Sequence, residues 1–184
     1  FAFAQVLVSV SQTEGRYGTT RTPRKFWSKW EEEEFSEADR EAIKNQPLSP
    51  DQVQALFSDK PANVRRHFEQ LWDNHVLPTE QDELLVGILS PKRLLSLLRY
   101  YILYYKHDKI IARYQQFFGI ESLLRRITGV DDEGSRHGGV IWHTTGSGKS
   151  FTMVFLSKLL ILHEALRQCR VIVVTDRVDL EKQL

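Results

Sequence analysis

The residues best suited to chemistry lie in one short stretch, Thr145-Gly-Ser-Gly-Lys-Ser150. Its two glycines let the backbone curl around an anion with N–H groups pointing inward, and a helix that begins at Lys149 turns the positive end of its dipole toward the same point. The lysine ammonium is suited to neutralise β- and γ-phosphates, and the Ser150 hydroxyl is a small, hard ligand for Mg²⁺. The sequence therefore predicts a phosphate-binding loop with ATP and Mg²⁺ as its ligands.

The residue two positions before this stretch departs from the plain motif. The full motif has a glycine six residues before the lysine, whereas this chain has His143, which we interpret as a residue that shapes the loop rather than a catalyst. No catalytic residue beyond Lys149 is expected among the 184 residues. The candidate nucleotide-binding residues of the loop are His143, Thr144, Thr145, Gly146, Ser147, Gly148, Lys149 and Ser150.

The elements on either side must hold this loop in place. Residues 139–142 are predicted to form a short buried strand, and residues 149–166 a helix, which is the strand–loop–helix context that a phosphate loop requires. The β-branched run Arg170-Val-Ile-Val-Val-Thr175 predicts a second buried strand. Strand, helix and strand together predict a right-handed βαβ unit in an α/β fold with a parallel sheet.

The region before the loop is predicted to be mostly helical. Residues 1–10 alternate as a strand would, with Val6, Val8 and Val10 on one face, and the acidic run 31–34 is interpreted as a solvated helix end. Apolar residues at helical spacing predict core helices over 65–77, from Ser90 to about Tyr105, and over 109–128. Residues 129–139 are rich in turn formers and separate these helices from the loop. Helix-start signals are present in the pairs Ser36 with Asp39, Ser49 with Gln52, and Ser90 with Pro91.

Composition sets broad limits on the function. The net charge of +1 neither requires nor excludes a nucleic-acid partner, and the lone Cys169 excludes an intramolecular disulfide. No apolar run reaches the roughly 18 residues that span a bilayer, so we expect a cytoplasmic protein with no membrane partner. The chain begins with Phe1 in an apolar alternating run, which we interpret as a fragment cut inside one domain at its start and inside another at its end.

Three segments together resemble a known family. They are Ile111-Ala-Arg-Tyr-Gln-Gln-Phe-Phe118, Gly139 to Met153 with Trp142-His-Thr-Thr-Gly-Ser-Gly-Lys-Ser150 at its centre, and Val173 to Leu184. They resemble the restriction (motor) subunit of type I restriction-modification enzymes, in which the histidine is the family's own variant of the loop. Upstream, Gln12 to Thr19 resembles the end of that subunit's nuclease domain, so the resemblance covers essentially the whole chain.

The resemblance implies a fold and a division into domains. Residues 1–35 would be the C-terminal part of a PD-(D/E)xK-type nuclease domain, residues 36–106 a helical connector, and residues 107–184 the N-terminal part of a RecA-like domain of helicase superfamily 2. It also implies ATP-driven translocation on double-stranded DNA, cleavage of unmodified DNA away from the recognition site, and assembly with modification (methyltransferase) and specificity subunits. Nuclease carboxylates are expected before Phe1, and the acidic Mg²⁺ motif after Leu184.

The resemblance also implies roles for residues outside the loop. Gln116, preceded by Arg113, would read the adenine edge, with Gln115 as a rival for that role. Thr175 and Arg177 are candidates for contacts with DNA phosphates, or belong simply to a charged helix N-terminus. Two other functions stay open: a different superfamily 2 DNA or RNA helicase, and a nucleotide-binding switch protein.

Overall fold

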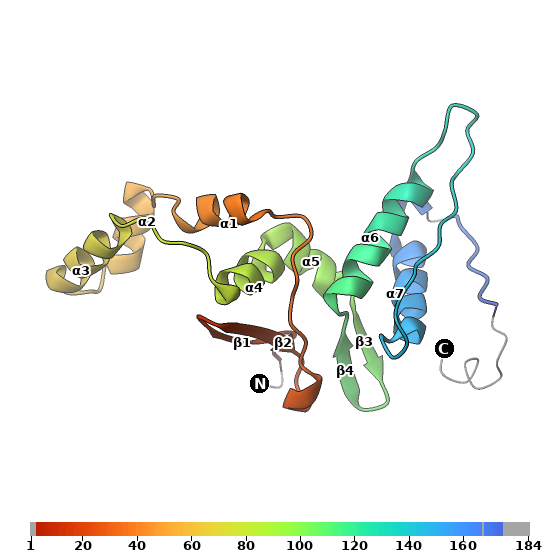
Figure 1. Ribbon diagram of the computed structural model, residues 1–184, viewed down its shortest axis with the longest axis horizontal. Coiled ribbons are helices and arrows are strands. Elements are labelled where there is room, and N and C mark those ends of the chain that lie inside the picture. Colours follow the sequence, from red (N-terminus) through yellow and green to blue (C-terminus); the bar gives the residue numbers. More distant parts are fainter. Residues whose placement is uncertain (1–2, 167, 175–184) are drawn as a thin grey trace.

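The computed structural model describes residues 3–166 and 168–174, which form two β-hairpins and a series of helices (Figure 1). The mixed α/β class predicted from the sequence is confirmed, although the sheets are small and antiparallel. The elements are β1 (Leu7–Ser11), β2 (Glu14–Gly18), η1 (Arg24–Phe26), α1 (Glu37–Lys44), α2 (Pro50–Phe57), α3 (Ala62–Trp72), α4 (Glu80–Leu89), α5 (Pro91–Tyr100), β3 (Ile102–Tyr105), β4 (Asp108–Ile111), α6 (Tyr114–Thr128), α7 (Lys149–Leu162) and η2 (Glu164–Leu166).

The first hairpin differs in part from the strand predicted over residues 1–10. Strand β1 begins at Leu7 and pairs with β2 in antiparallel register, from Leu7 opposite Gly18 to Ser11 opposite Glu14. Val8 and Val10 are each 40% exposed, so the predicted valine face is not the buried one. The core side of the hairpin comes instead from β2, where the Tyr17 side chain is buried and its hydroxyl donates to the Ala112 carbonyl at 2.8 Å.

A second hairpin replaces the ends of two predicted helices. The sequence predicts helix through Tyr105 and again from residue 109, but β3 and β4 pair there as antiparallel strands. Branched and aromatic side chains such as those of Ile102 and Ile110 fit a pleated strand at least as well as a helix. Lys106 turns the chain with a φ of 56°, and the Thr19 hydroxyl donates to the Lys109 carbonyl. Tertiary contacts with the first hairpin therefore decide between two patterns that the local sequence allows.

The three predicted helix starts are confirmed; at α5, Ser90 is the N-cap and Pro91 occupies the first turn, with no side-chain cap bond. Ser36 and Asp39 form a capping box at α1, and Ser49 and Gln52 form another at α2, where Pro50 occupies the first turn. Each box satisfies backbone N–H groups that have no partner inside the helix. Helix boundaries set by such short-range bonds are the part of the fold that the sequence predicts best.

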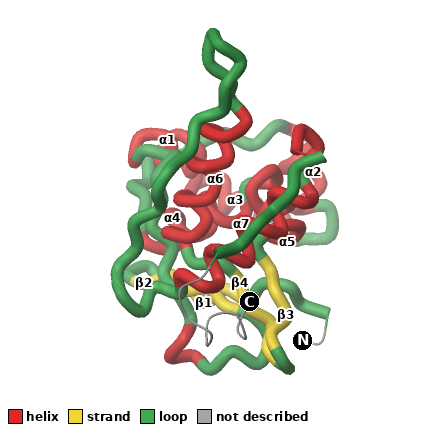
Figure 2. Tube along the Cα trace, turned by 90° about the vertical axis from the view of Figure 1, so that its right-hand side faces the viewer, coloured by secondary structure: helices red, strands yellow, loops and turns green. Residues whose placement is uncertain are grey.

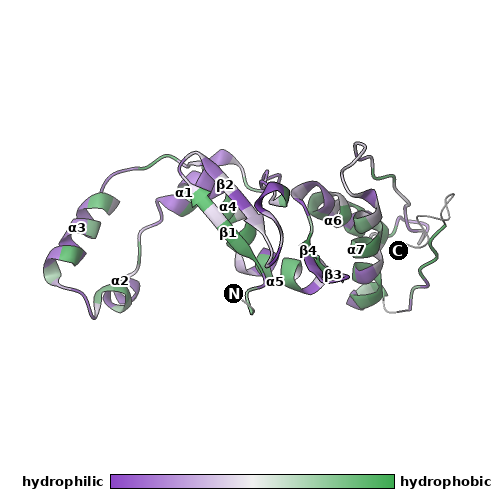
Figure 3. Ribbon diagram, turned by 90° about the horizontal axis from the view of Figure 1, so that it is seen from below, coloured by the Kyte–Doolittle hydropathy of each residue, from purple (hydrophilic) through white to green (hydrophobic). Residues whose placement is uncertain are grey.

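The core role predicted for the helix over residues 65–77 is wrong. In α3, Phe68 is 40% exposed, Leu71 48% and Trp72 45%. The reason is position: Figures 1 and 3 both place α2 and α3 at the end of the molecule away from α6 and α7. The aromatic rings there pack on one another, as Phe57 of α2 does on Phe68 of α3 at 5.7 Å between ring centroids.

The interpretation of the acidic run as solvated is also wrong for its second residue. The Glu32 side chain is fully buried and forms an ion pair with Arg93, which is itself 5% exposed. Glu34 pairs with the same guanidinium at 2.6 Å, and the Trp30 indole N–H donates to Glu32 at 2.8 Å. Burial raises the pKa of Glu32, but the hydrogen bonds from Trp30, the Glu34 backbone and Arg93 outweigh it and hold this pKa below its ordinary value.

This ion pair lies inside the aromatic centre of the fold. The guanidinium of Arg93 lies 5.6 Å from the Trp30 ring centroid and 5.3 Å from that of Phe118. Phe117 lies against Tyr101 at 4.8 Å between centroids, and Tyr101 also contacts Phe155 of α7. The N-terminal segment, α5, α6 and α7 therefore share one buried cluster.

Neither strand predicted beside the loop is present in the described residues. Residues 139–142 have irregular backbone, with Val140 90% and Trp142 89% exposed, and residues 170–174 are likewise irregular, with Ile172 76% exposed. A buried parallel strand needs a hydrogen-bonded neighbour on each side, and the two hairpins of the described residues adjoin neither segment. After α6 the chain makes a projecting turn and returns along that helix (Figures 1 and 2).

Candidate nucleotide-binding site

The predicted phosphate loop lies directly before α7 and has the backbone that a phosphate cradle requires. Gly146 has a φ of 80° and Gly148 a φ of 85°, both in the left-handed region where only glycine is unstrained. Gly148 is the N-cap of α7, which begins at Lys149 as predicted and ends at Leu162, where residues 149–166 were predicted. The free N–H groups of the first turn and the positive end of the helix dipole thus face the loop.

The loop is closed by its own hydrogen bonds. The backbone N–H and the hydroxyl of Ser147 both donate to the Thr144 carbonyl, at 3.3 and 2.7 Å. The Thr152 N–H donates to the Gly148 carbonyl at 3.1 Å, which is the first intrahelical bond of α7. These bonds form a tight turn between Thr144 and Gly148, and Thr145 is exposed within it.

The two side chains expected to meet phosphate and Mg²⁺ are available. Lys149 is exposed and Ser150 is half-buried, and neither forms a side-chain hydrogen bond or ion pair with the residues that the structure describes. Both line a cavity of about 540 Å³ together with Thr145, Gly146, Gly148 and three apolar side chains, those of Tyr105, Phe151 and Val154. A hard hydroxyl beside a free ammonium fits a magnesium–triphosphate ligand, because Mg²⁺ usually keeps phosphate and water ligands beside one or two protein oxygens.

Gln116 lies beside the loop. Its side-chain amide donates to the Gly148 carbonyl at 3.0 Å and to the Ser147 carbonyl at 3.4 Å, and its amide oxygen accepts the Arg113 N–H at 2.9 Å. The residue is buried, whereas its rival Gln115 is exposed. The amide of Gln116 is thus engaged with the loop and the first turn of α6, and this is the geometry from which any contact with a base must start.

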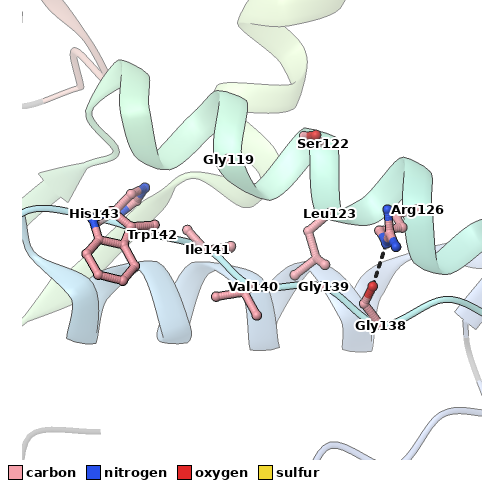
Figure 4. A pocket seen from close by; sticks show the side chains of 10 residues that line it. All are labelled: Gly119, Ser122, Leu123, Arg126, Gly138, Gly139, Val140, Ile141, Trp142 and His143. Atoms are coloured by element: carbon pink, nitrogen blue, oxygen red, sulfur yellow. Dashed lines mark hydrogen bonds between the residues drawn. The ribbon is translucent and has the colours of Figure 1, made fainter.

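His143 packs against α6, as Figure 4 shows. A Cβ placed on Gly119 would lie 3.4 Å from the imidazole Nε2, so the ring lies close to this turn of α6. The Nδ1 atom is buried without a hydrogen-bond partner in the described residues. The open cavity of about 700 Å³ in Figure 4 lies between α6 and residues 138–143, and the Arg126 guanidinium donates to the Gly138 carbonyl at its far end.

The two predicted DNA-contact residues, Thr175 and Arg177, lie outside the described residues, and one residue that was not predicted lies at the loop. Tyr105 was not expected at the loop; its ring meets Phe151 edge-on at 6.1 Å between centroids. No sequence signal near residue 105 reveals this contact, since it exists only because β3 and β4 fold as a hairpin. Among the described residues there is no group of three or more acidic, histidine or cysteine side chains that would hold a metal, and no helix is long and apolar enough to cross a bilayer.

Comparison with known proteins gives consistent matches. Residues 115–184 match the SWI2/SNF2 ATPase family. The chain is 39% identical over 135 residues, 70% of its length, to the type I restriction enzyme HindI endonuclease subunit of Haemophilus influenzae. It is 38% identical over 52% of its length to the putative MjaVIIP endonuclease subunit of Methanocaldococcus jannaschii, and 29% identical over its whole length to the putative MjaIXP endonuclease subunit of the same organism.

These matches cover only part of each relative. The chain spans 12% of the Haemophilus protein and 10% and 16% of the two Methanocaldococcus proteins. No solved structure matches the chain. With a stretch that matches the SWI2/SNF2 ATPase family, and with these relatives named as type I endonuclease subunits, the chain is a homologue of the endonuclease (R) subunits of type I restriction enzymes.

Proposed function

We propose that this chain is part of the ATP-dependent DNA translocase and endonuclease subunit of a type I restriction enzyme. The observation that carries the proposal is the left-handed Gly146 and Gly148 loop at the start of α7, in a sequence homologous to such subunits. ATP hydrolysis would move the subunit along double-stranded DNA, and unmodified foreign DNA would be cleaved away from its recognition site. Modification and specificity subunits would be its partners.

The proposed roles of the loop residues follow from their chemistry. Backbone N–H groups from Thr145 to Ser150 would hold the phosphate oxygens, and the free ammonium of Lys149 would neutralise their charge. The Ser150 hydroxyl would be one ligand of Mg²⁺. His143 would shape the loop through its contact with Gly119. No other catalytic residue is proposed within the 184 residues.

The proposed domains follow the same resemblance. Residues 1–35 would close a PD-(D/E)xK-type nuclease domain, residues 36–106 would connect it to the motor, and residues 107–184 would begin a RecA-like domain. In the whole subunit, residues 139–142 and 170–175 would then pair as parallel strands. The exposure of Val140, Trp142 and Ile172 supports this pairing, because apolar side chains at such positions are usually covered. Thr175 and Arg177 would contact DNA at the end of the second strand.

Two other functions are compared with this proposal, because the SWI2/SNF2 match alone fits any superfamily 2 motor. A helicase or remodelling motor without a nuclease would share the loop and α6. A nucleotide-binding switch would also share the loop, but would not translocate. Endonuclease activity of the full-length protein separates the first alternative from our proposal, and ATP-driven displacement of a DNA triplex separates the second.

The test is Lys149→Ala in the full-length protein with its partner subunits. Loss of the ammonium is expected to abolish ATP hydrolysis and translocation, and with them cleavage of unmodified plasmid, while far-UV circular dichroism stays unchanged. Lys92→Ala is the matched control, since Lys92 is an exposed lysine on α5 that lines no part of the loop cavity. Normal cleavage by the Lys149 variant would overturn the proposed role of the loop.

A further inference from the structure

A second cavity adjoins the phosphate loop, and Lys149 does not line it. Its volume is about 480 Å³, within the range of small-molecule sites. Gly146, Gly148 and Phe151 line both this cavity and the one that contains Lys149 and Ser150, so the two meet at the loop. A molecule held by its phosphates at the start of α7 can therefore extend into the second cavity.

The two cavities differ in chemistry. The cavity over Lys149 and Ser150 contains the ammonium and hydroxyl suited to phosphate and Mg²⁺. The second cavity contains neither of these residues, but it contains Arg113 and Gln116 from the start of α6 and the aromatic ring of Phe26. The exposed Phe26 ring and the Arg113 guanidinium both line this cavity, and a flat heteroaromatic group can stack on either of them.

The wall opposite the loop comes from residues 18–28, which follow β2. Phe26 belongs to η1, lines the cavity and is 56% exposed, so its ring is accessible to a bound ligand. Among the lining residues the only acidic side chain is that of Asp108, whereas Arg21, Lys109 and Arg113 are basic. Lys109 points elsewhere, since its ammonium donates to the Ala4 carbonyl at 3.0 Å.

Hydrogen bonds hold residues 18–28 against β4 and brace the turn that they form. The Thr19 hydroxyl donates to the Lys109 carbonyl of β4. Two backbone hydrogen bonds of 2.9 and 3.0 Å join Tyr17 to Ser28 and so close the turn at its two ends. The Trp27 indole packs on Gly18, where a Cβ would lie 2.9 Å from the ring, and its N–H donates to the Thr22 carbonyl at 3.0 Å. Phe26 is thus presented by a braced turn rather than by a free loop.

From these contacts we infer that the cavity between residues 18–28 and the phosphate loop is the subsite for the base and ribose of the bound nucleotide, with the base stacked on Phe26. The inference rests on the proposed function of the loop as a triphosphate site. It assigns part of the nucleotide pocket to residues 18–28, in addition to the residues from 107 onward that are proposed to begin the motor domain. It also gives Gln116 the task of fixing the loop between the two cavities, because its amide is bound to the Ser147 and Gly148 carbonyls.

Two ligands separate the two cavities in a binding experiment. Inorganic tripolyphosphate with Mg²⁺ probes the phosphate cavity alone, whereas MgATP probes both. Calorimetric titration of the full-length protein with each ligand is compared for the wild type, Phe26→Ala and Phe26→Trp. The matched control is Leu56→Ala, since Leu56 is 54% exposed, close to the 56% of Phe26, and lies on the distant α2.

The expected result for Phe26→Ala is a Kd for MgATP raised about tenfold, the size of one lost stacking contact, with the Kd for tripolyphosphate unchanged. Phe26→Trp is expected to retain ATP affinity, and Leu56→Ala to change neither Kd. Unchanged ATP affinity in Phe26→Ala overturns the inference, and so does an equal loss for both ligands, which would mean that Phe26 only supports the loop. If the wild type binds neither ligand, the phosphate-loop function fails, and the subsite with it.

Discussion

The side-chain amide of Gln116 donates to the carbonyl of Gly148, the N-cap of α7, at 3.0 Å. This bond ties the first turn of α6 to the first turn of the loop helix. A Cβ on Gly148 would lie 2.9 Å from the same amide nitrogen, so the two residues leave no space between them. The geometry of the phosphate loop is therefore set partly by a residue 32 positions earlier in the chain.

The first prediction concerns this bond. Gln116→Ala leaves the carbonyls of Ser147 and Gly148 without that donor, a loss of about 1–2 kcal/mol for a partly buried pair. We expect faster amide hydrogen exchange over residues 145–152 and weaker ATP binding. Gln115→Ala is the matched control because Gln115 is exposed, and it is expected to leave both measurements unchanged. The opposite ranking of the two variants would assign the role to Gln115.

A second prediction concerns the backbone of the loop. Gly148→Ala adds a methyl group at a φ of 85° and against Gln116, and is expected to cost about 1–2 kcal/mol for the left-handed backbone alone. ATP affinity should fall accordingly in equilibrium titrations. Gly134→Ala separates strain from contact, since Gly134 has a φ of 78° but a Cβ there would meet nothing within 4 Å. Equal ATP affinity in the two variants would contradict a specific role of Gly148.

The third prediction concerns the buried ion pair of Glu32 and Arg93. Arg93→Ala removes the only cation paired with buried Glu32 in the described residues, and breaking such a pair costs about 3 kcal/mol in the free energy of unfolding. Arg99→Ala on the same helix is the control, because Arg99 is exposed. Urea denaturation at pH 7 measures both. A loss as small as that of Arg99→Ala would show that the pair contributes little.

The same pair gives a pH dependence, tested with Glu32→Gln. The pKa of Glu32 is lower in the folded protein than its ordinary value, so its ionised form stabilises the fold. This contribution is fully present above the unfolded-state pKa, about 4.3, and is lost as the pH falls through the lower folded-state pKa. The difference in unfolding free energy between wild type and Glu32→Gln should therefore be constant from pH 7 to 5 and shrink below pH 4. A difference that grows in acid would refute the assignment.

The last prediction concerns the 184 residues on their own. In our proposal the loop holds the phosphates and offers one hydroxyl to Mg²⁺, and the described residues contain no group of three or more Asp, Glu, His or Cys side chains that could hold a metal ion. We expect weak nucleotide binding and no measurable ATP turnover from the isolated chain. A coupled ATPase assay against Lys149→Ala decides the matter: hydrolysis that depends on Lys149 would mean that the catalytic set is present.

The sequence predicted the parts of the fold that depend on short-range chemistry. The caps at Ser36 and Ser49 and the helix that begins at Lys149 each follow from residues within one turn of each other. The hairpin of β3 and β4 was missed because its apolar residues satisfy helical and strand spacing alike, and distant contacts such as those of Thr19 with Lys109 and of Lys158 with Ile102 favour the strands.

The candidate site divides in the same way. The loop from Thr144 to Ser150 is visible as a local pattern, whereas Tyr105 and Phe26 reach it only through the tertiary arrangement of the two hairpins. The buried state of Glu32 was missed for a related reason. A run of four glutamates has the composition of a solvated surface, and its burial depends on a single arginine about 60 positions later.

The buried pair of Glu32 and Arg93 has a practical consequence for dissecting this protein. A truncation at residue 36, the boundary that the sequence predicts, would remove Tyr17, Trp30 and Glu32 while leaving Arg93 in place. The shortened protein would carry an unpaired cation against the exposed rings of Phe117 and Phe118, and would be prone to aggregate on expression. Residues 17–34 thus belong to the same core as α5, α6 and α7, and a soluble fragment that contains these helices has to include them.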